Sequence, residues 1–260
     1  MSAPDPWLDL RRLTAARIAL GRSGVSLPTA ESLRFAQAHA MARDAVHAAL
    51  DAAALRDALA GDGYRVARVH SAAPDRASYL RRPDLGRRLA PAAAARLAEL
   101  AAQADGEPPA LVVVLADGLS ATAVAAHGLP LLLALQPLLV AQQQAPSWVV
   151  VAEQARVALG DEVGALLRAQ AVLVLVGERP GLSSPDSLGA YLTWAPRIGC
   201  MDAERNCVSN IRPAGLNMAA AAHRIAWLLV AARRLLATGL ALKDASELAG
   251  LVSIVPGSAG

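Results

Sequence analysis

The sequence predicts an α/β fold in which a parallel sheet is covered by helices on both faces. Three apolar runs lead to this prediction, "ALVVVLA" (residues 110–116), "SWVVVAE" (147–153) and "AVLVLVG" (171–177). Helical stretches separate the runs, and strands that are apolar throughout are typical of parallel sheets buried on both sides. Aromatic residues make up only 3% of the chain, so alanine and leucine carry the apolar content, which favours helices. We therefore expect a Rossmann-like, doubly wound domain behind a mostly helical N-terminal region.

The stretch "DGEPP" (105–109) marks the expected boundary between two regions of the chain. Residues 1–108 are expected to be mostly helical, and residues 109–260 are expected to form the α/β domain. The elements expected before the boundary are a short amphipathic helix within 9–24, a helix from a cap at Thr29 to about Leu59, a short strand at 63–71, a basic turn at 79–89 and a helix at 90–104. Beyond the third apolar run, residues 190–196 can add another strand, and residues 215–239 predict a long closing helix.

The apolar content raises the question of a membrane segment. The most apolar window, "LPLLLALQPLLVA" (129–141), is short and is interrupted by Pro130, Gln136 and Pro137. It falls below the roughly 18–20 apolar residues that a span needs. The chain does not open with a basic segment followed by an apolar one, so no secretory signal is expected. We expect a soluble, cytoplasmic protein without a membrane partner.

Cysteines and arginines limit the chemistry further. Cys200 and Cys207 fit no zinc spacing, and we expect both to be free thiols in the cytoplasm. Lys243 is the sole lysine, and the other basic residues are arginines, with doublets at 11–12, 81–82, 87–88 and 233–234. These arginines could bind phosphate or nucleic acid, or they could form ion pairs at surfaces and interfaces. Because aromatic residues are not interleaved with them, no nucleic-acid partner is expected.

Polar residues follow all three apolar runs. They are Asp117–Gly118, then Glu153 to Val157, then Glu178 to Gly181 in "GERPG". Ligands of open parallel sheets bind at the carboxyl ends of the strands, so these residues mark a candidate site. The alternative for Glu178 and Arg179 is a mutual ion pair that merely closes the strand.

Complete catalytic motifs are missing from the sequence. There is no G-x-G-x-x-G after a strand, no phosphate-binding G-x-x-x-x-G-K-[ST] and no G-x-S-x-G elbow. A binding edge without a catalytic set suits a subunit that completes the active site of another chain. A stand-alone nucleotide-binding α/β protein and an RNA-binding or scaffold protein remain as alternatives from the residues alone.

Several long motifs resemble the light (small) chain of ethanolamine ammonia-lyase. In sequence order they are "LRRLTAARIALGRSG" (10–24), "YLRRPDLGRRL" (79–89), "VVLADGLSATA" (113–123), "ARVALGDEVGALLRAQAV" (155–172), "LVGERPGLSSPDSLGAYLTW" (175–194) and "PRIGCMDAERNCVSNIRPAG" (196–215). The likeness covers nearly the whole chain. It implies a subunit of an adenosylcobalamin-dependent radical enzyme that converts ethanolamine to acetaldehyde and ammonia.

The resemblance also implies how the work is divided. The substrate ethanolamine binds in the large (heavy) subunit, and the light chain helps to hold the cofactor at the interface of a hetero-oligomer. The cofactor supplies the difficult chemistry, which explains why this chain lacks a catalytic set. We therefore expect no catalytic residue and no metal ligand on this chain.

Matched by motif, the implied cofactor contacts are Val157 in "ARV", Glu178 in "VGERPG" and Cys207 in "ERNC". Glu178 can accept hydrogen bonds from amide side chains of the corrin, Val157 offers an apolar surface, and Cys207 is a small, soft neighbour. Arg156 and Arg179 are further candidates for polar or nucleotide-tail contacts. The arginines of the basic turn could serve the interface or the cofactor.

Some relatives in this family reach a bacterial microcompartment through an amphipathic N-terminal helix. The residues before Leu8 are few and include two prolines, which does not favour such a helix. The N-terminus therefore does not support microcompartment targeting.

Overall fold

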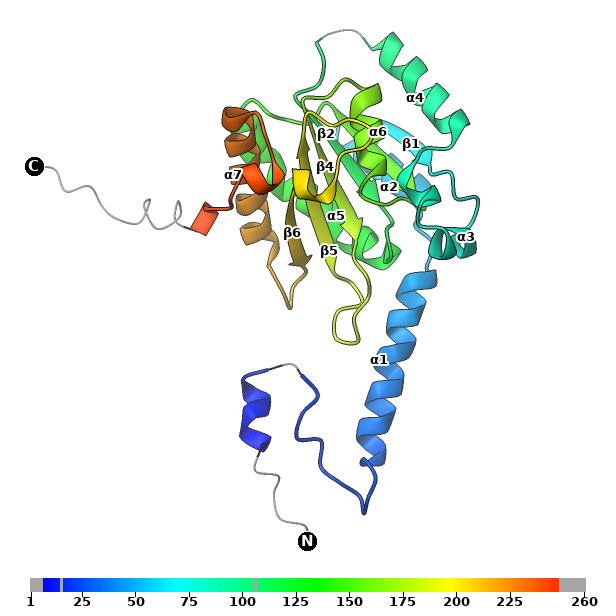
Figure 1. Cartoon of the computed structure of the whole chain (residues 1–260), viewed down its shortest axis with the longest axis vertical. Coiled ribbons are helices and arrows are strands. Elements are labelled where there is room, and N and C mark those ends of the chain that lie inside the picture. Colours follow the sequence, from blue (N-terminus) through cyan, green and yellow to red (C-terminus); the bar gives the residue numbers. More distant parts are fainter. Residues whose placement is uncertain (1–6, 15, 105–106, 248–260) are drawn as a thin grey trace, which may run out of the picture.

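A six-stranded sheet lies at the centre of the computed structural model, which describes residues 7–14, 16–104 and 107–247 (Figure 1). The strands are β1 (Arg65–His70), β2 (Leu111–Ala116), β3 (Trp148–Glu153), β4 (Ala171–Gly177), β5 (Leu188–Trp194) and β6 (Arg205–Ile211). Their order across the sheet is β1-β3-β2-β4-β5-β6. The first four are parallel, whereas β5 runs antiparallel to both β4 and β6. The sheet is thus mixed and mostly parallel, and the expectation of a wholly parallel sheet is wrong at this edge.

The three strands predicted from apolar runs form the buried middle of the sheet. Every residue of β2 and β4 is buried, as is every residue of β3 before Glu153. Valine and leucine dominate these strands because helices cover both of their faces. The strand expected at 190–196 is β5, whereas β6 was not predicted.

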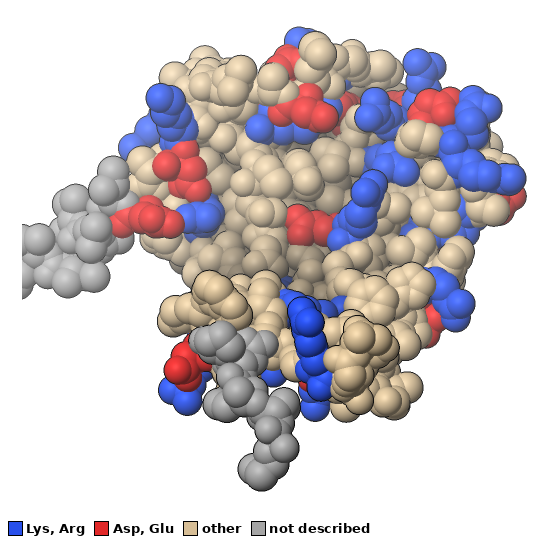
Figure 2. Space-filling model, turned by 60° about the horizontal axis from the view of Figure 1, so that its bottom comes forward, with Lys and Arg blue, Asp and Glu red and all other residues tan. Residues whose placement is uncertain are grey.

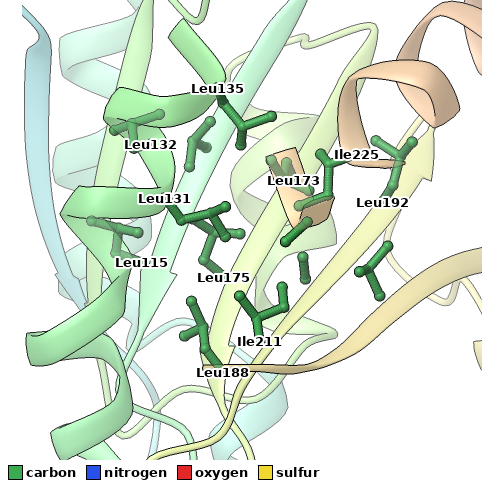
Figure 3. Packing of buried hydrophobic residues seen from close by; sticks show 14 of the residues in the cluster. Leu115, Leu131, Leu132, Leu135, Leu173, Leu175, Leu188, Leu192, Ile211 and Ile225 are labelled. Carbon is green, nitrogen blue, oxygen red and sulfur yellow. The ribbon is translucent and has the colours of Figure 1, made fainter. Parts of the chain in front are cut away.

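Helices of two separate layers pack on the sheet. Buried side chains of α2 (Ala52–Gly61), α5 (Ala121–Ala141) and α7 (Met218–Leu235) form one cluster with one face of the strands (Figure 3). Those of α4 (Pro91–Gln103) and α6 (Leu159–Leu166) form a second cluster with the other face. Successive residues of β4 divide between the clusters, since Leu173 and Leu175 belong to the first and Val172 and Val174 to the second. This alternation is the period of two that a strand imposes.

The apolar window at 129–141 lies inside α5. In the described part of the chain, α5 is the one helix long and apolar enough to cross a membrane by length and composition. Its helix continues through Pro130 and Pro137, and its leucines Leu131, Leu132 and Leu135 are fully buried. The helix packs on one face of the sheet, beside α7 (Figure 3). It is therefore a core helix of a soluble protein.

The single helix predicted from Thr29 to Leu59 is wrong, because the chain forms two. Helix α1 (Thr29–His47) starts at Thr29 itself, with Pro28 at the cap position. The chain then breaks at residues 48–51, where Leu50 is buried in the core. Asp51 caps α2 by accepting the N–H of Ala54 at 3.0 Å. Residues 29–59 are rich in alanine, which is compatible with any position of a helix. The sequence pattern therefore did not reveal this break.

The remaining elements are short. They are η1 (Leu8–Arg12), α3 (Arg76–Arg81), η2 (Leu85–Arg87), η3 (Asp202–Glu204) and η4 (Gly239–Ala241). The amphipathic helix expected within 9–24 is thus only the 3₁₀ turn η1, and the basic turn contains α3 and η2. The division at residue 108 does not follow an edge of the sheet, since β1 pairs with β3 and α4 packs beside α6. That division stays a prediction.

Candidate functional site

Within the described residues, no helix covers one part of the sheet. The cluster beneath α4 and α6 contains buried side chains of β1, β2, β3 and β4, and it reaches β5 only through the partly buried Tyr191. On this side of the sheet, β5 and β6 present Gly189, Tyr191 and Cys207, while Leu188, Ala190 and Val208 point into the opposite cluster. We call the surface formed by Gly189, Tyr191 and Cys207 the open face.

Glu178 stands at the edge of the open face, directly after β4. Its Oε2 accepts a hydrogen bond from Ser187 Oγ at 2.5 Å and one from the backbone N–H of Asn210 at 3.2 Å. These contacts tie the carboxylate to the ends of β5 and β6. Among the described residues, no ion pair joins Glu178 to Arg179. The alternative explanation of the "GERPG" turn as a mutual ion pair is therefore wrong.

Gly189 leaves room for the Glu178 carboxylate. A Cβ at position 189 would lie 2.9 Å from Glu178 Oε1 and 3.1 Å from a ring carbon of Tyr191. Any side chain here would press on both neighbours. The absence of a side chain at this position lets the carboxylate and the ring meet at the open face.

Tyr191 and Cys207 form a cross-strand pair in the centre of the open face. Burial and then the neighbouring thiol raise the pKa of Tyr191 above its usual value of 10.0. Burial, followed by the charge of Glu178, also raises the pKa of Cys207, and a hydrogen bond with Tyr191 opposes this rise. Both groups are neutral near pH 7, so the face offers an aromatic ring and an uncharged thiol.

The loop between β3 and α6 forms one side of the site, and Asp117 fixes its course. Asp117 is 3% exposed and accepts the N–H groups of Gln154 at 2.9 Å and Ala155 at 3.0 Å. Burial raises the pKa of Asp117, against the effect of these N–H groups and of Arg76. The strand end "ADG" thereby positions Arg156 and Val157, which come next in the chain.

Arg156 and Val157 line a groove of about 670 Å³ that borders the open face at Tyr191. The Arg156 guanidinium stacks on the ring of Tyr79 at 4.8 Å, and its buried Nε has no hydrogen-bond partner among the described residues. Arg87 and Arg88 of the basic turn line the same groove. Three arginines therefore gather on the α6 side of the site.

Residues 197–202 close the groove on its other side. Arg205 of β6 donates a hydrogen bond to the carbonyl of Cys200 at 2.7 Å, which holds this segment near the sheet. Ile198 and Met201 are about 70% exposed at the rim of the groove, at 71% and 70%. Exposed apolar side chains next to a polar groove are typical of a surface that receives a partner or ligand.

Comparison with known proteins places this geometry in a family. Residues 4–243 match the family described as ethanolamine ammonia-lyase light chain (EutC). The chain is 54% identical over 255 residues to the ethanolamine ammonia-lyase small subunit of Pseudomonas aeruginosa, covering 98% of this chain and 93% of that protein. The small subunit of Azotobacter vinelandii is 53% identical over 247 residues (95% and 91%), and that of Ralstonia nicotianae is 54% identical over 244 residues (94% and 90%).

The chain belongs to the ethanolamine ammonia-lyase light chain family. The resemblance inferred from the sequence motifs is thereby confirmed. The match also argues against a stand-alone nucleotide-binding protein and against an RNA-binding scaffold, because it extends over nearly the full length of curated small subunits.

The structure brings most of the light-chain candidates together. Glu178 and Cys207 lie next to Tyr191, the first at Gly189 and the second across the strand pair, and Val157 lines the same groove as Tyr191. Arg156 lies beside them in the groove. Arg179 is exposed on the β4–β5 loop and is not among the groove residues. Cys200 and Cys207 are both free thiols.

Sequence reasoning missed Tyr191, although it lies at the centre of the open face. A signal was present in "LGAYLTW", where Leu188, Ala190 and Leu192 alternate with Gly189, Tyr191 and Thr193. That period of two assigns Tyr191 to the opposite face from the leucines. What the sequence did not show is that no helix covers that face.

Proposed function

We propose that the open face, with Glu178 at its edge and the loop of Val157 at its side, is one wall of an adenosylcobalamin site. By its family, the chain is the small subunit of ethanolamine ammonia-lyase (EC 4.3.1.7). This enzyme converts ethanolamine to acetaldehyde and ammonia. The large subunit supplies the other wall and the substrate site. One observation carries the proposal: Glu178, Cys207 and Val157 converge around Tyr191 on uncovered sheet.

The residues of the open face suit this cofactor. A corrin is broad and flat, with an apolar ring and amide side chains around its edge. The open face offers a flat strand pair with an aromatic ring and a neutral thiol, while the Glu178 carboxylate at its edge is an acceptor for amide N–H groups. Gly189 keeps the space between them clear.

The chain's part in the reaction is to bind and orient. The cofactor, when bound, supplies the radical that removes hydrogen from ethanolamine, so this chain needs no catalytic group. In our proposal Glu178 would accept hydrogen bonds from the amide side chains of the cofactor, Val157 would cover its apolar ring edge, and Cys207 would be a small, uncharged neighbour. Arg156 serves the polar or nucleotide-tail side of the cofactor, and Arg179 can reach it from the β4–β5 loop.

The fold supports a finer interpretation of the domain. Helices on both faces of four parallel strands fit a Rossmann-like, doubly wound domain, and the site lies at the carboxyl ends of its strands, where such domains bind ligands. We place the protein in the cytoplasm. Residues 1–6, on which the expectation about microcompartment targeting mainly rests, lie outside the described residues.

The test is reconstitution with the large subunit of the same organism. The two-chain complex, given adenosylcobalamin and ethanolamine, is expected to form acetaldehyde and to retain cobalamin on a desalting column. The isolated chain is expected to form none and to retain little cofactor, because it provides only one wall. Turnover by the isolated chain, or a complex that binds cobalamin no better than the large subunit alone, would contradict the proposal.

A further inference from the structure

Residues 7–47, which we call the arm, extend away from the rest of the molecule. Figure 1 shows α1 projecting from the end at which β4 and β6 finish, with η1 set well apart from the sheet. Within α1, only Ala42 and Ala45 are buried, near its C-terminal end. The core of the same chain therefore contributes almost no packing contacts that would stabilise the described part of the arm.

The arm exposes many large apolar side chains to solvent, which is unusual for a segment without a binding partner. Large apolar side chains along it are 40–102% exposed; these are Trp7, Leu8, Leu10, Leu13, Val25, Leu27, Leu33, Phe35 and Met41. So many exposed apolar side chains on one segment are typical of a site of protein association. A standard interface takes about 800 Å² from each partner, and nine such side chains along one arm offer surface of that order.

The base of the arm is fixed to the site end of the sheet. Arg76 Nε donates to the carbonyl of Val46 at 2.7 Å, and its Nη1 donates to the carbonyl of Gly118 at 2.7 Å. Gly118 follows β2 at the same end of the sheet as Glu178, and its neighbour Leu119 bonds the carbonyl of Gly177 at 2.9 Å. Whatever binds the arm is therefore brought to the side of the molecule that carries the open face.

The arm also has internal order. The guanidinium of Arg17 lies over the ring of Phe35 at 5.3 Å, which links the segment before the turn to α1. Ser23 and Ser26 form a bridge around Gly24, whose φ of +64° suits a tight turn. An arm that already has a shape loses less conformational entropy on binding than a disordered tail does.

Charge decides between two possible occupants of the arm. Residues 7–47 contain six arginines but only three carboxylates, so two identical arms would repel each other. Figure 2 looks onto the end from which the arm extends and shows basic side chains, with acidic ones among them, around a wide uncharged area. A partner that fits this surface is apolar with acidic groups at its rim, and a second copy of this chain is not.

We infer that the arm docks on the large subunit, on a surface that is apolar with an acidic rim, and so brings the open face against the second wall of the cofactor site. This inference rests on the proposed function, because it takes the large subunit as the partner. The arm then provides most of the contact between the two subunits, and the open face contacts mainly the cofactor.

The test compares exposed leucines of equal accessibility. Leu13 on the arm and Leu240 in η4 are both 83% exposed. Leu13→Glu and Leu33→Glu are expected each to weaken binding of the purified large subunit by about tenfold or more, whereas Leu240→Glu leaves binding unchanged. Binding is measured by biolayer interferometry with immobilised large subunit, and raising the salt concentration is expected to weaken the wild-type complex. Circular dichroism melts of the isolated variants are expected to match wild type, because the changed side chains are exposed.

Each outcome bears on the inference. Equal binding by wild type and both arm variants would overturn it while leaving the two-chain function intact. A wild-type chain that dimerises in sedimentation experiments, with Leu13→Glu restoring the monomer, would assign the arm to a second copy and overturn it as well. Failure of the wild-type chain to bind the large subunit at all would instead overturn the proposed function, and the inference with it.

Discussion

Arg205 on β6 and Asp161 on α6 form a bidentate ion pair in which each side chain is only 2% exposed. The guanidinium also donates to the hydroxyl of Thr193 at 3.1 Å. The pair joins the antiparallel edge of the sheet to a helix that covers its parallel part. It also anchors the segment that closes the groove, since the same side chain holds the carbonyl of Cys200.

Arg205→Met is expected to destabilise the protein strongly, because it leaves the Asp161 carboxylate buried without its partner. Breaking a buried pair in this way costs about 3–5 kcal/mol. Urea unfolding of the isolated chain, followed by circular dichroism, measures the loss. The matched control is Arg197→Met, which breaks a solvent-exposed pair with Glu204 and is expected to have little effect on stability. Similar losses for both variants would show that the buried pair has no special role.

Two glycines at the site end of the sheet are expected to respond differently to alanine. A Cβ at Gly177 would lie 2.0 Å from the backbone oxygen of Ser120, and a backbone atom cannot move aside cheaply. A Cβ at Gly189 would meet chiefly the flexible end of Glu178, at 2.9 Å. Gly177→Ala is therefore expected to cost about 3 kcal/mol or more, and Gly189→Ala about 1 kcal/mol, in urea unfolding. The order would be contradicted if Gly189→Ala were the more damaging change.

Glu178→Ala in the assembled enzyme is expected to raise the apparent dissociation constant of adenosylcobalamin. One hydrogen bond to a charged group contributes about 1.5–3 kcal/mol, which is about 10- to 150-fold in affinity. The KM for ethanolamine should change much less, because the substrate binds in the large subunit. Cofactor titration followed by activity and by cobalamin absorbance measures the effect, once gel filtration has shown normal assembly.

Two controls separate the proposed role of Glu178 from its structural one. Ser187→Ala removes the hydroxyl that Glu178 accepts but keeps the carboxylate, so its effect on cofactor affinity should be smaller. Ser183→Ala changes an exposed side chain of the same loop and should have no effect. If Glu178→Ala assembles normally and binds the cofactor as tightly as wild type, the carboxylate serves only Ser187 and Asn210.

Cys207 is expected to react slowly with thiol reagents near neutral pH, although the residue as a whole is solvent-exposed. Protein atoms packed around the sulfur raise the pKa of the thiol above the usual 9.0, so little thiolate is present at pH 7. Labelling should accelerate about tenfold per pH unit until the pKa is approached. Tyr191→Phe removes a hydrogen bond that lowers this pKa and should slow labelling further.

Bound adenosylcobalamin in the assembled enzyme is expected to protect Cys207 from the same reagent. Mass spectrometry of peptides resolves the two thiols, and Cys200 reports changes that are not specific to the open face. Equal labelling of Cys207 with and without cofactor would place the cofactor elsewhere.

The parallel core of the fold could be predicted because its strands are apolar throughout. β6 could not, since "RNCVSNI" lacks the regular alternation of polar and apolar residues and begins with an arginine. Arg205 is tolerated there only because Asp161, far away in the sequence, neutralises it. The break between α1 and α2 was hidden for a similar reason, because it depends on Leu50 entering a core that the rest of the chain builds.

The candidate site was predicted unevenly. Strand-end chemistry pointed to Glu178 and Asp117, and family motifs pointed to Val157 and Cys207. Neither route found Tyr191. Its importance comes from the lack of a covering helix over β5 within the described residues, and a sequence motif does not show this. The hydrogen bonds that the β3–α6 loop donates to Asp117 were equally hidden, since they join residues about forty positions apart.

The reversal of strand direction after β4 determines which described strands lack a helix on one side. A parallel successor to β4 would require a crossover of a dozen or more residues, and such a crossover normally lays a helix across the sheet. Instead, residues 178–187 fold straight back into β5, and residues 195–204 lead into β6 with no α-helix between them. The connections of the described chain thus leave β5 and β6 without a helix on the side of the open face. A loop insertion long enough to add a crossover helix would bury the open face even if every residue on it were unchanged.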